Sequence, residues 1–136
     1  MPTLASLEKG HEFAAAEFEL SPDWVSAYIL AVEDDAIPCV DPDAVPPMAI
    51  AALSIRALLD QAALPPGTVH VGQETVFSRG ARAGERLAAS ACILSRGERQ
   101  GWVLMVVDMS VAGAGGDLVM NGRATLTFPV DGEADA

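Results

Sequence analysis

The chain has 136 residues, of which 51% are hydrophobic, and it carries a formal net charge of −11 at pH 7. This length predicts one domain with a core large enough to fold without staples, and the composition excludes a disordered chain. The negative charge argues against general binding to nucleic acids or anionic membranes, because both require clustered Lys and Arg.

Two isolated cysteines and the N-terminal sequence bear on the cellular location. Cys39 and Cys92 form no C-x-x-C pattern and have no histidine at metal-ligand spacing, so we interpret both as reduced thiols and expect neither a metal nor a cofactor. No basic segment followed by an apolar run marks a signal peptide. The apolar run of residues 48–59 is interrupted by Arg56 and is too short to cross a bilayer. We therefore expect a cytoplasmic protein without membrane contact.

The first predicted elements are an extended segment and a short helix. Residues 11–20 are interpreted as a strand or an extended lead-in. Ser21, Pro22 and Asp23 then supply an N-cap, a first-turn proline and an acid that complements the helix dipole. Apolar residues at helical spacing follow, so residues 22–33 are predicted to form an amphipathic helix.

An acidic loop separates this helix from a second one. Five carboxylates belong to the loop or flank it: Glu33, Asp34, Asp35, Asp41 and Asp43. Pro46 and Pro47 then begin a helix that is predicted to run to about Leu64, where the next prolines end it. Its apolar residues surround most of its circumference, which predicts a helix that is buried on most sides.

Everything after Gly67 is typical of β-structure. Four segments are rich in β-branched, aromatic and alternating apolar residues: 69–77, 85–94, 102–111 and 118–128. The short connections between consecutive strands predict an antiparallel meander, with Arg96 and Arg99 solvated in one of its turns. Helices followed by an antiparallel sheet make an α+β domain, and a curved sheet around the second helix is the hotdog fold. We assign residues 1–130 to this domain and residues 131–136 to an acidic tail.

Two segments make the chain similar to the MaoC-like, hotdog-fold hydratases and dehydratases that act on acyl thioesters. The first is YILAVEDDAIP at residues 28–38, followed by DPDA at 41–44 and the proline-led helix. The second is VHVGQETVF at residues 69–77, followed by Arg79, Arg82 and AGERL at 83–87. The second segment resembles most the N-terminal halves of double-hotdog hydratases.

The resemblance implies an acid/base pair that is incomplete in this chain. In such enzymes an Asp and a His, in the pattern Asp-x-Asn-Pro-x-His, hold the water that adds to the enoyl group, while a helix N-terminal amide polarises the thioester carbonyl. Aligned on Pro38, Asp35 takes the Asp position, Ile37 the Asn position and Val40 the His position. Related chains without this His are often the non-catalytic members of heterodimers. For Asp35 we favour a structural carboxylate in a turn, with Asp34 as an equally placed neighbour.

His70 and Gln73 form the second candidate group, because related hydratase halves also carry a His followed shortly by a Gln. His70 can replace the missing imidazole if its strand borders the acyl tunnel, with Gln73 binding substrate. The favoured interpretation of His70 is a structural histidine whose polar atoms are satisfied.

Arg79, Arg82 and Arg86 are candidates for binding the phosphates of coenzyme A or of a phosphopantetheine group. The alternative is a solubilising hairpin surface, and the sequence leaves both open.

Together these observations predict an acyl-binding subunit of an enoyl-thioester hydratase or 3-hydroxyacyl-thioester dehydratase. Its ligand would be an acyl-CoA or acyl-carrier-protein thioester. A single hotdog exposes a sheet edge and an apolar face, so we expect a second hotdog chain as partner, in a homodimer or with a His-bearing catalytic chain. Two alternatives remain: a self-sufficient homodimeric enzyme, either a hydratase using Asp35 with His70 or a thioesterase, and a non-enzymatic module that binds an acyl chain or carrier protein.

Overall fold

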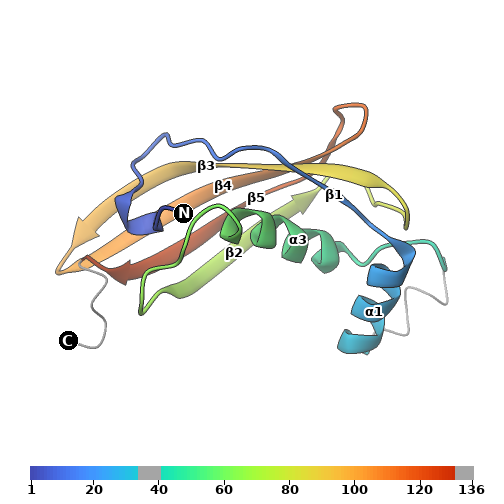
Figure 1. The fold of residues 1–136 in the computed structure, drawn as a ribbon, viewed down its shortest axis with the longest axis horizontal. Coiled ribbons are helices and arrows are strands. Elements are labelled where there is room, and N and C mark those ends of the chain that lie inside the picture. Colours follow the sequence, from blue (N-terminus) through green and yellow to red (C-terminus); the bar gives the residue numbers. More distant parts are fainter. Residues whose placement is uncertain (34–40, 131–136) are drawn as a thin grey trace.

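A five-stranded antiparallel sheet curves around one helix in the computed structural model, which describes residues 1–33 and 41–130 (Figure 1). The central helix is α3 (Pro47–Leu59), and α1 (Pro22–Val32) lies beyond its N-terminal end. The remaining elements are η1 (Leu4–Ser6), β1 (Ala16–Glu19), β2 (Val69–Phe77), β3 (Arg86–Arg99), β4 (Trp102–Gly113) and β5 (Leu118–Pro129). The predicted α+β class is confirmed. None of the described helices is long and apolar enough to cross a membrane.

Helix α1 begins as the sequence predicts. The Ser21 side chain accepts a hydrogen bond from the backbone N–H of Trp24 at 3.1 Å, and Pro22 occupies the first helical position. The helix ends at Val32, because Glu33 adopts a left-handed conformation (φ 56°) and its N–H returns to the carbonyls of Ile29 and Leu30. These signals are local, so the predicted range differs from the observed one by a single residue.

Helix α3 is shorter than predicted, because it ends at Leu59 instead of near Leu64. The next residues bind the N-terminal segment: Ala63 exchanges backbone hydrogen bonds with Pro2 and Leu4, and the Gln61 side chain bonds both backbone groups of Ala14 at 2.8 Å. Backbone groups used in this way are not available to continue a helix. Contacts with the N-terminal segment thus determine where α3 ends.

The predicted meander is correct for three strands and wrong for the first long one. The strand order is β1-β3-β4-β5-β2, so β2 pairs with β5 and not with β3. Residues 78–85 can span roughly 26 Å, whereas β3 lies three strand spacings, about 14 Å, from β2. This connection crosses the N-terminal end of α3, where Val45 N–H donates to the Ala81 carbonyl and Ala83 N–H to that of Asp43.

The turn between β3 and β4 is tighter than predicted. Strand β3 continues to Arg99, and Gln100 (φ 53°) and Gly101 (φ 84°) alone make the turn. Arg96 therefore lies in a strand, with its side chain only 17% exposed and bonded to Glu98 and to the Ala5 carbonyl. The expectation of a solvated Arg96 in a turn is wrong, because the N-terminal segment covers this part of the sheet.

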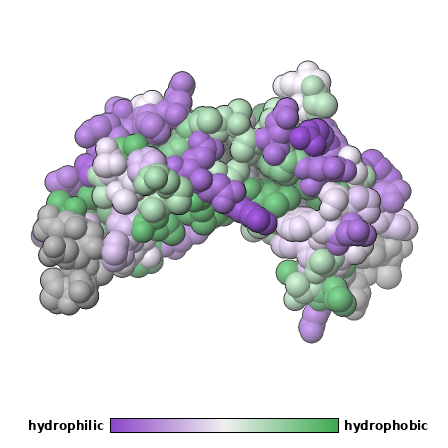
Figure 2. Space-filling view, viewed as in Figure 1, coloured by the Kyte–Doolittle hydropathy of each residue, from purple (hydrophilic) through white to green (hydrophobic). Residues whose placement is uncertain are grey.

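The inner faces of β3, β4 and β5 pack against α3 and the N-terminal segment. Buried residues alternate along these strands, and they form one cluster near each end of α3. Helix α3 is not covered all round, since Met48 is 56% and Leu59 37% exposed. Figure 2 shows apolar residues on the side that carries α3 and α1. The apolar surface of α3 is therefore only partly covered, and the candidate functional site lies between this helix and strand β2.

Candidate functional site

Strand β2 carries a row of polar side chains on its inner face. His70 lies opposite Leu126 and Gln73 lies opposite Ala124, and both β5 residues belong to the core. In a regular strand, residues three apart point to opposite faces. A bulge between His70 and Gly72 adds one residue to β2, so both side chains point towards α3.

His70 and Gln73 interact directly. His70 Nε2 lies 3.1 Å from Gln73 Oε1, so the imidazole donates from Nε2 to the amide oxygen. The other end of the amide, Gln73 Nε2, is buried and has no hydrogen-bond partner among the described residues. The structure thus brings together two residues that the sequence singled out, and it leaves one polar atom of the pair unused.

A pocket of about 150 Å³ adjoins this pair, between the C-terminal half of α3 and strands β2 and β5. It is lined by Ile55, Leu58, Leu59, Leu64, Thr68, His70, Ala124 and Leu126. The Thr68 hydroxyl donates to the Pro65 carbonyl at 2.5 Å, so His70 is the polar group left on an otherwise apolar lining. The volume is below the ~300 Å³ of typical small-molecule sites. It therefore suits one apolar segment of a longer ligand.

Asp35, the candidate acid, lies outside the described residues, as do its neighbours from Asp34 to Val40. The first described residue after this gap, Asp41, is bound by Arg82 at 2.9 Å, and Asp43 lies 3.3 Å from the same guanidinium. The hydrogen bond from Arg82 lowers the pKa of Asp41 below its usual value. This ion pair holds the chain after the gap against the connection between β2 and β3, at the N-terminal end of α3.

The three candidate phosphate-binding arginines all contact carboxylates of the chain itself. Arg79 binds Glu85 at 2.5 Å and Asp117 at 2.6 Å, while Arg86 lies 3.7 Å from Glu17. Arg82 binds Asp41 and Asp43 as described. A phosphate would have to compete with these carboxylates for each arginine. The competition is weakest at Arg86, because its ion pair with Glu17 is the longest and its side chain is 60% exposed.

Arg79 connects two loops through its guanidinium. Hydrogen bonds from Arg79 lower the pKa values of Glu85 and Asp117, and these acids in turn raise the pKa of Arg79. A Cβ atom on Gly113 would collide with both the Arg79 guanidinium and the Asp117 carboxylate. Glycine at 113 is therefore required for this network, which joins the β4–β5 turn to the start of β3.

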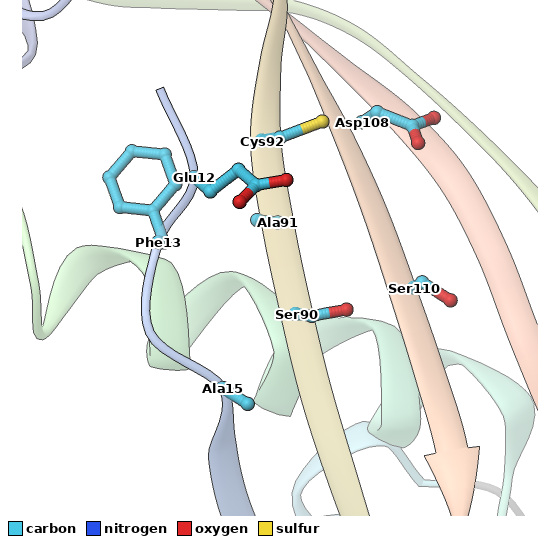
Figure 3. Close-up of a pocket in the computed structure, with 8 residues that line it drawn as sticks. All are labelled: Glu12, Phe13, Ala15, Ser90, Ala91, Cys92, Asp108 and Ser110. Carbon is cyan, nitrogen blue, oxygen red and sulfur yellow. The ribbon is translucent and has the colours of Figure 1, made fainter. Parts of the chain in front are cut away.

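A second pocket, of about 310 Å³, lies between the N-terminal segment and strands β3 and β4. Figure 3 shows Cys92 and Glu12 side by side in it, with Asp108 on the next strand. Burial raises the pKa of the half-buried Cys92 thiol, and the charges of Asp108 and Glu12 raise it further. Such a thiol stays protonated and is a poor nucleophile. Within the described ranges, no three His, Cys, Asp or Glu side chains are arranged to hold a metal ion.

No protein-family model matches the sequence, and no curated protein matches it. Solved structures resemble the chain over most of its length. The (R)-hydratase from A. caviae involved in PHA biosynthesis is 22% identical, with a TM-score of 0.76, covering 91% of this chain and 98% of that one. The HadBC (3R-hydroxyacyl-ACP dehydratase) complex from Mycobacterium tuberculosis, truncated at the C terminus, is 24% identical, with a TM-score of 0.77, covering 92% and 100%.

The chain has the hotdog fold. The resemblance to MaoC-like proteins implied this fold, and the strand order and central helix agree with it. The same fold occurs in a variant of the fluoroacetyl-CoA-specific thioesterase FlK, which is 14% identical, with a TM-score of 0.68, covering 93% of this chain and 91% of that one. At identities of 14–24% the likeness concerns the fold, and the activity must be argued from the site.

The α3 side of the pocket could not be predicted from the sequence. Its apolar residues belong to a predicted apolar helix, and nothing in the spacing of Ile55, Leu58 and Leu59 distinguishes a pocket wall from core. Pro65 and Pro66 were the available sequence signal that the chain turns there, which brings Leu64 and Thr68 beside His70.

Proposed function

We propose that the chain is an acyl-thioester-binding subunit of an enoyl-thioester hydratase or a 3-hydroxyacyl-thioester dehydratase. The observation that carries this proposal is the apolar pocket between α3 and strands β2 and β5, with the His70–Gln73 pair at its side. Apolar walls with a few placed polar groups are typical of sites that bind small apolar ligands. The hydratase and dehydratase with the same fold support the same class of reaction.

The position of His70 supports a catalytic histidine from another chain. His70 lines the pocket with Leu58 and Leu59 at the C-terminal end of α3. Phe77, at the other end of β2, packs with the cluster that contains Ala49 at the start of α3, and the strand between His70 and Phe77 spans roughly 20 Å. A general acid or base must lie within hydrogen-bond reach of its substrate atom. His70 is thus too distant to act on a carbonyl bound at the N-terminus of α3 in the same chain.

We further propose that the partner is a second hotdog chain that pairs along the free edge of β2. Strand β1, at the other edge, has four residues, whereas β2 has nine. Val69, Val71 and Val76 on β2 are 52%, 58% and 63% exposed, and a long apolar edge strand with unpaired backbone groups favours pairing with another strand. Such a partner would lie directly beside the pocket, where it can complete the site. The structural neighbour HadBC, which is a complex, supports a hotdog chain as partner.

The first test is hydration of crotonyl-CoA, followed by loss of the enoyl-thioester absorbance. The purified chain would be assayed alone and together with a hotdog chain that carries Asp, Asn, Pro and His in order and is encoded beside it. We expect no turnover by this chain alone, turnover by the pair, and binding of acyl-CoA by the pair with higher affinity than by the partner alone.

Three results would contradict the proposal. Turnover by this chain alone, abolished by Asp35→Asn, would mean a self-sufficient hydratase, and release of free coenzyme A would mean a thioesterase. Failure to bind any acyl thioester, alone or with a partner, would remove the acyl-binding role altogether.

A further inference from the structure

We propose that Gln73 donates a hydrogen bond to an oxygen atom in the distal part of the bound acyl chain. The chain would therefore select acyl groups that carry a keto or hydroxyl oxygen at that position over plain alkyl groups. This inference rests on the proposed function, since it requires an acyl chain in the pocket between α3 and β2.

The oxygen of the Gln73 amide accepts a hydrogen bond, whereas its nitrogen has no partner among the described residues. With His70 protonated on Nε2, the Gln73 Oε1 accepts a hydrogen bond from this nitrogen at 3.1 Å. Gln73 Nε2 is buried, and within residues 1–33 and 41–130 no group accepts a hydrogen bond from it. A buried donor without an acceptor is destabilising, so such groups in native proteins usually have a partner. We infer that an oxygen of the bound ligand supplies this acceptor.

The available donor lies beside the apolar pocket. Gln73 is the strand partner of Ala124, which lines the pocket, and His70, which holds Gln73, lines it as well. Ile55 and Leu58 on the α3 side supply no polar atom. A plain alkyl chain would fill the pocket and leave Nε2 unsatisfied. An acyl chain with an oxygen atom beside Ala124 would fill the same space, and this oxygen would accept the hydrogen bond from Gln73 Nε2.

The place of Gln73 along β2 determines which part of the ligand it meets. Phe77 packs against the cluster that contains Ala49 at the start of α3, and Gln73 lies about 13 Å back along the strand. The free backbone N–H groups at the N-terminus of a helix attract carbonyl oxygens. With the thioester carbonyl bound there, the oxygen that Gln73 contacts belongs well down the acyl chain and not next to the thioester.

The test compares matched ligands on the full-length chain. Binding of the decanoyl thioester of N-acetylcysteamine would be measured by calorimetry, beside isomers with one keto or one hydroxyl oxygen at successive carbons. We expect isomers with a distal oxygen to bind about tenfold more tightly than the plain chain. Gln73→Met, which replaces the amide by an apolar group of similar shape, should remove this preference, so that the oxygenated isomers bind no more tightly than the plain chain. Thr75→Val, on the same face of β2, should keep the preference.

The outcomes separate this inference from the proposed function. Equal binding of plain and oxygenated chains by the unsubstituted protein would overturn the selectivity and leave acyl binding intact, whereas no binding of any thioester, alone or with the partner chain, would overturn both. A preference that survives in Gln73→Met would overturn the role of Gln73. Loss of self-association in sedimentation velocity by Gln73→Met, with ligand preference unchanged, would assign Nε2 to a subunit contact and also overturn the proposal.

Discussion

His70 and Gln73 are hydrogen-bonded across 3.1 Å because strand β2 contains one residue more than its partner β5 at this point. The extra residue, Val71, turns His70 to the face that Gln73 already occupies, so two side chains that a regular strand would separate meet beside the pocket. The polar edge of the pocket therefore depends on a backbone irregularity and not on residue type alone.

Deleting Val71 is expected to keep this pair together, because His70 and Gln73 are then two residues apart in a regular strand and point to the same face. The pairs His70–Leu126 and Gln73–Ala124 are retained without the bulge, so nuclear Overhauser contacts between the His70 ring and the Leu126 methyl groups should persist. Val71→Thr keeps the bulge and serves as the control, because the Val71 side chain is 58% exposed. Loss of the His70–Leu126 contacts in the deletion variant would mean that the strand shifts its register without the bulge.

Gly122→Ala is expected to destabilise the protein by about 2 kcal/mol, because overpacking a close contact typically costs this much. A Cβ on Gly122 would collide with the backbone carbonyl of Glu74 on β2, so β2 and β5 would have to move apart. Urea unfolding followed by circular dichroism measures the effect. Gly97→Ala is the matched control, since a Cβ on this strand glycine meets nothing within 4 Å. Equal stability of the two variants would contradict the close approach of β2 to β5.

Arg79→Gln is expected to make the free energy of unfolding depend less on pH in the acidic range. Hydrogen bonds from Arg79 lower the pKa values of Glu85 and Asp117 below their ordinary values of 4.5 and 3.8. This stabilisation is complete above those values and is lost as the pH falls through the lowered pKa values in the folded protein. The free energy of unfolding, measured by urea titration between about pH 6 and pH 3, should therefore fall less steeply in Arg79→Gln. Arg99→Gln removes the same charge, and its profile should follow that of the unsubstituted protein.

Arg86→Gln tests whether the arginine cluster meets a phosphate. Arg86 is 60% exposed and only loosely paired with Glu17, so we expect its loss to weaken binding of an acyl-CoA roughly threefold, as for an exposed ion pair. Binding of the same acyl group on N-acetylcysteamine, which has no phosphate, should not change. Arg123→Gln is the control, since Arg123 is 58% exposed and lies 3.9 Å from Asp108. Equal losses for both ligands, or none, would favour the solubilising hairpin surface.

Val76→Lys is expected to prevent pairing with a second hotdog chain. Val76 is 63% exposed on the edge strand β2, and a charged side chain on an edge strand opposes strand pairing. Sedimentation velocity should show that the variant stays a single chain at concentrations where the unsubstituted protein associates. Leu104→Lys adds the same charge to the central strand β4 at a position 52% exposed. If Leu104→Lys prevents association and Val76→Lys does not, the partner binds the outer face of the sheet.

Much of the secondary structure could be predicted from neighbouring residues alone. The Ser21 cap and Pro22 set the start of α1, and the predicted range of β2 matches the observed strand from Val69 to Phe77. The predictions are wrong at positions where segments that are distant in the sequence contact each other. Helix α3 stops early because Ala63 pairs with Pro2 and Leu4, and Arg96 is half-buried because it reaches Ala5.

The sequence by itself determined the α+β class, most element boundaries, the hotdog arrangement that the resemblance implied, and the choice of His70 and Gln73 as candidates. The class and the boundaries follow from caps, prolines and alternation, which act within a few residues of the chain, whereas the choice of His70 and Gln73 follows from the resemblance. Only the tertiary structure decided that β2 pairs with β5, that a bulge brings His70 to Gln73, and that α3 completes an apolar pocket beside them. Such features depend on backbone pairing and packing between segments far apart in the chain, for which no local pattern provides a signal.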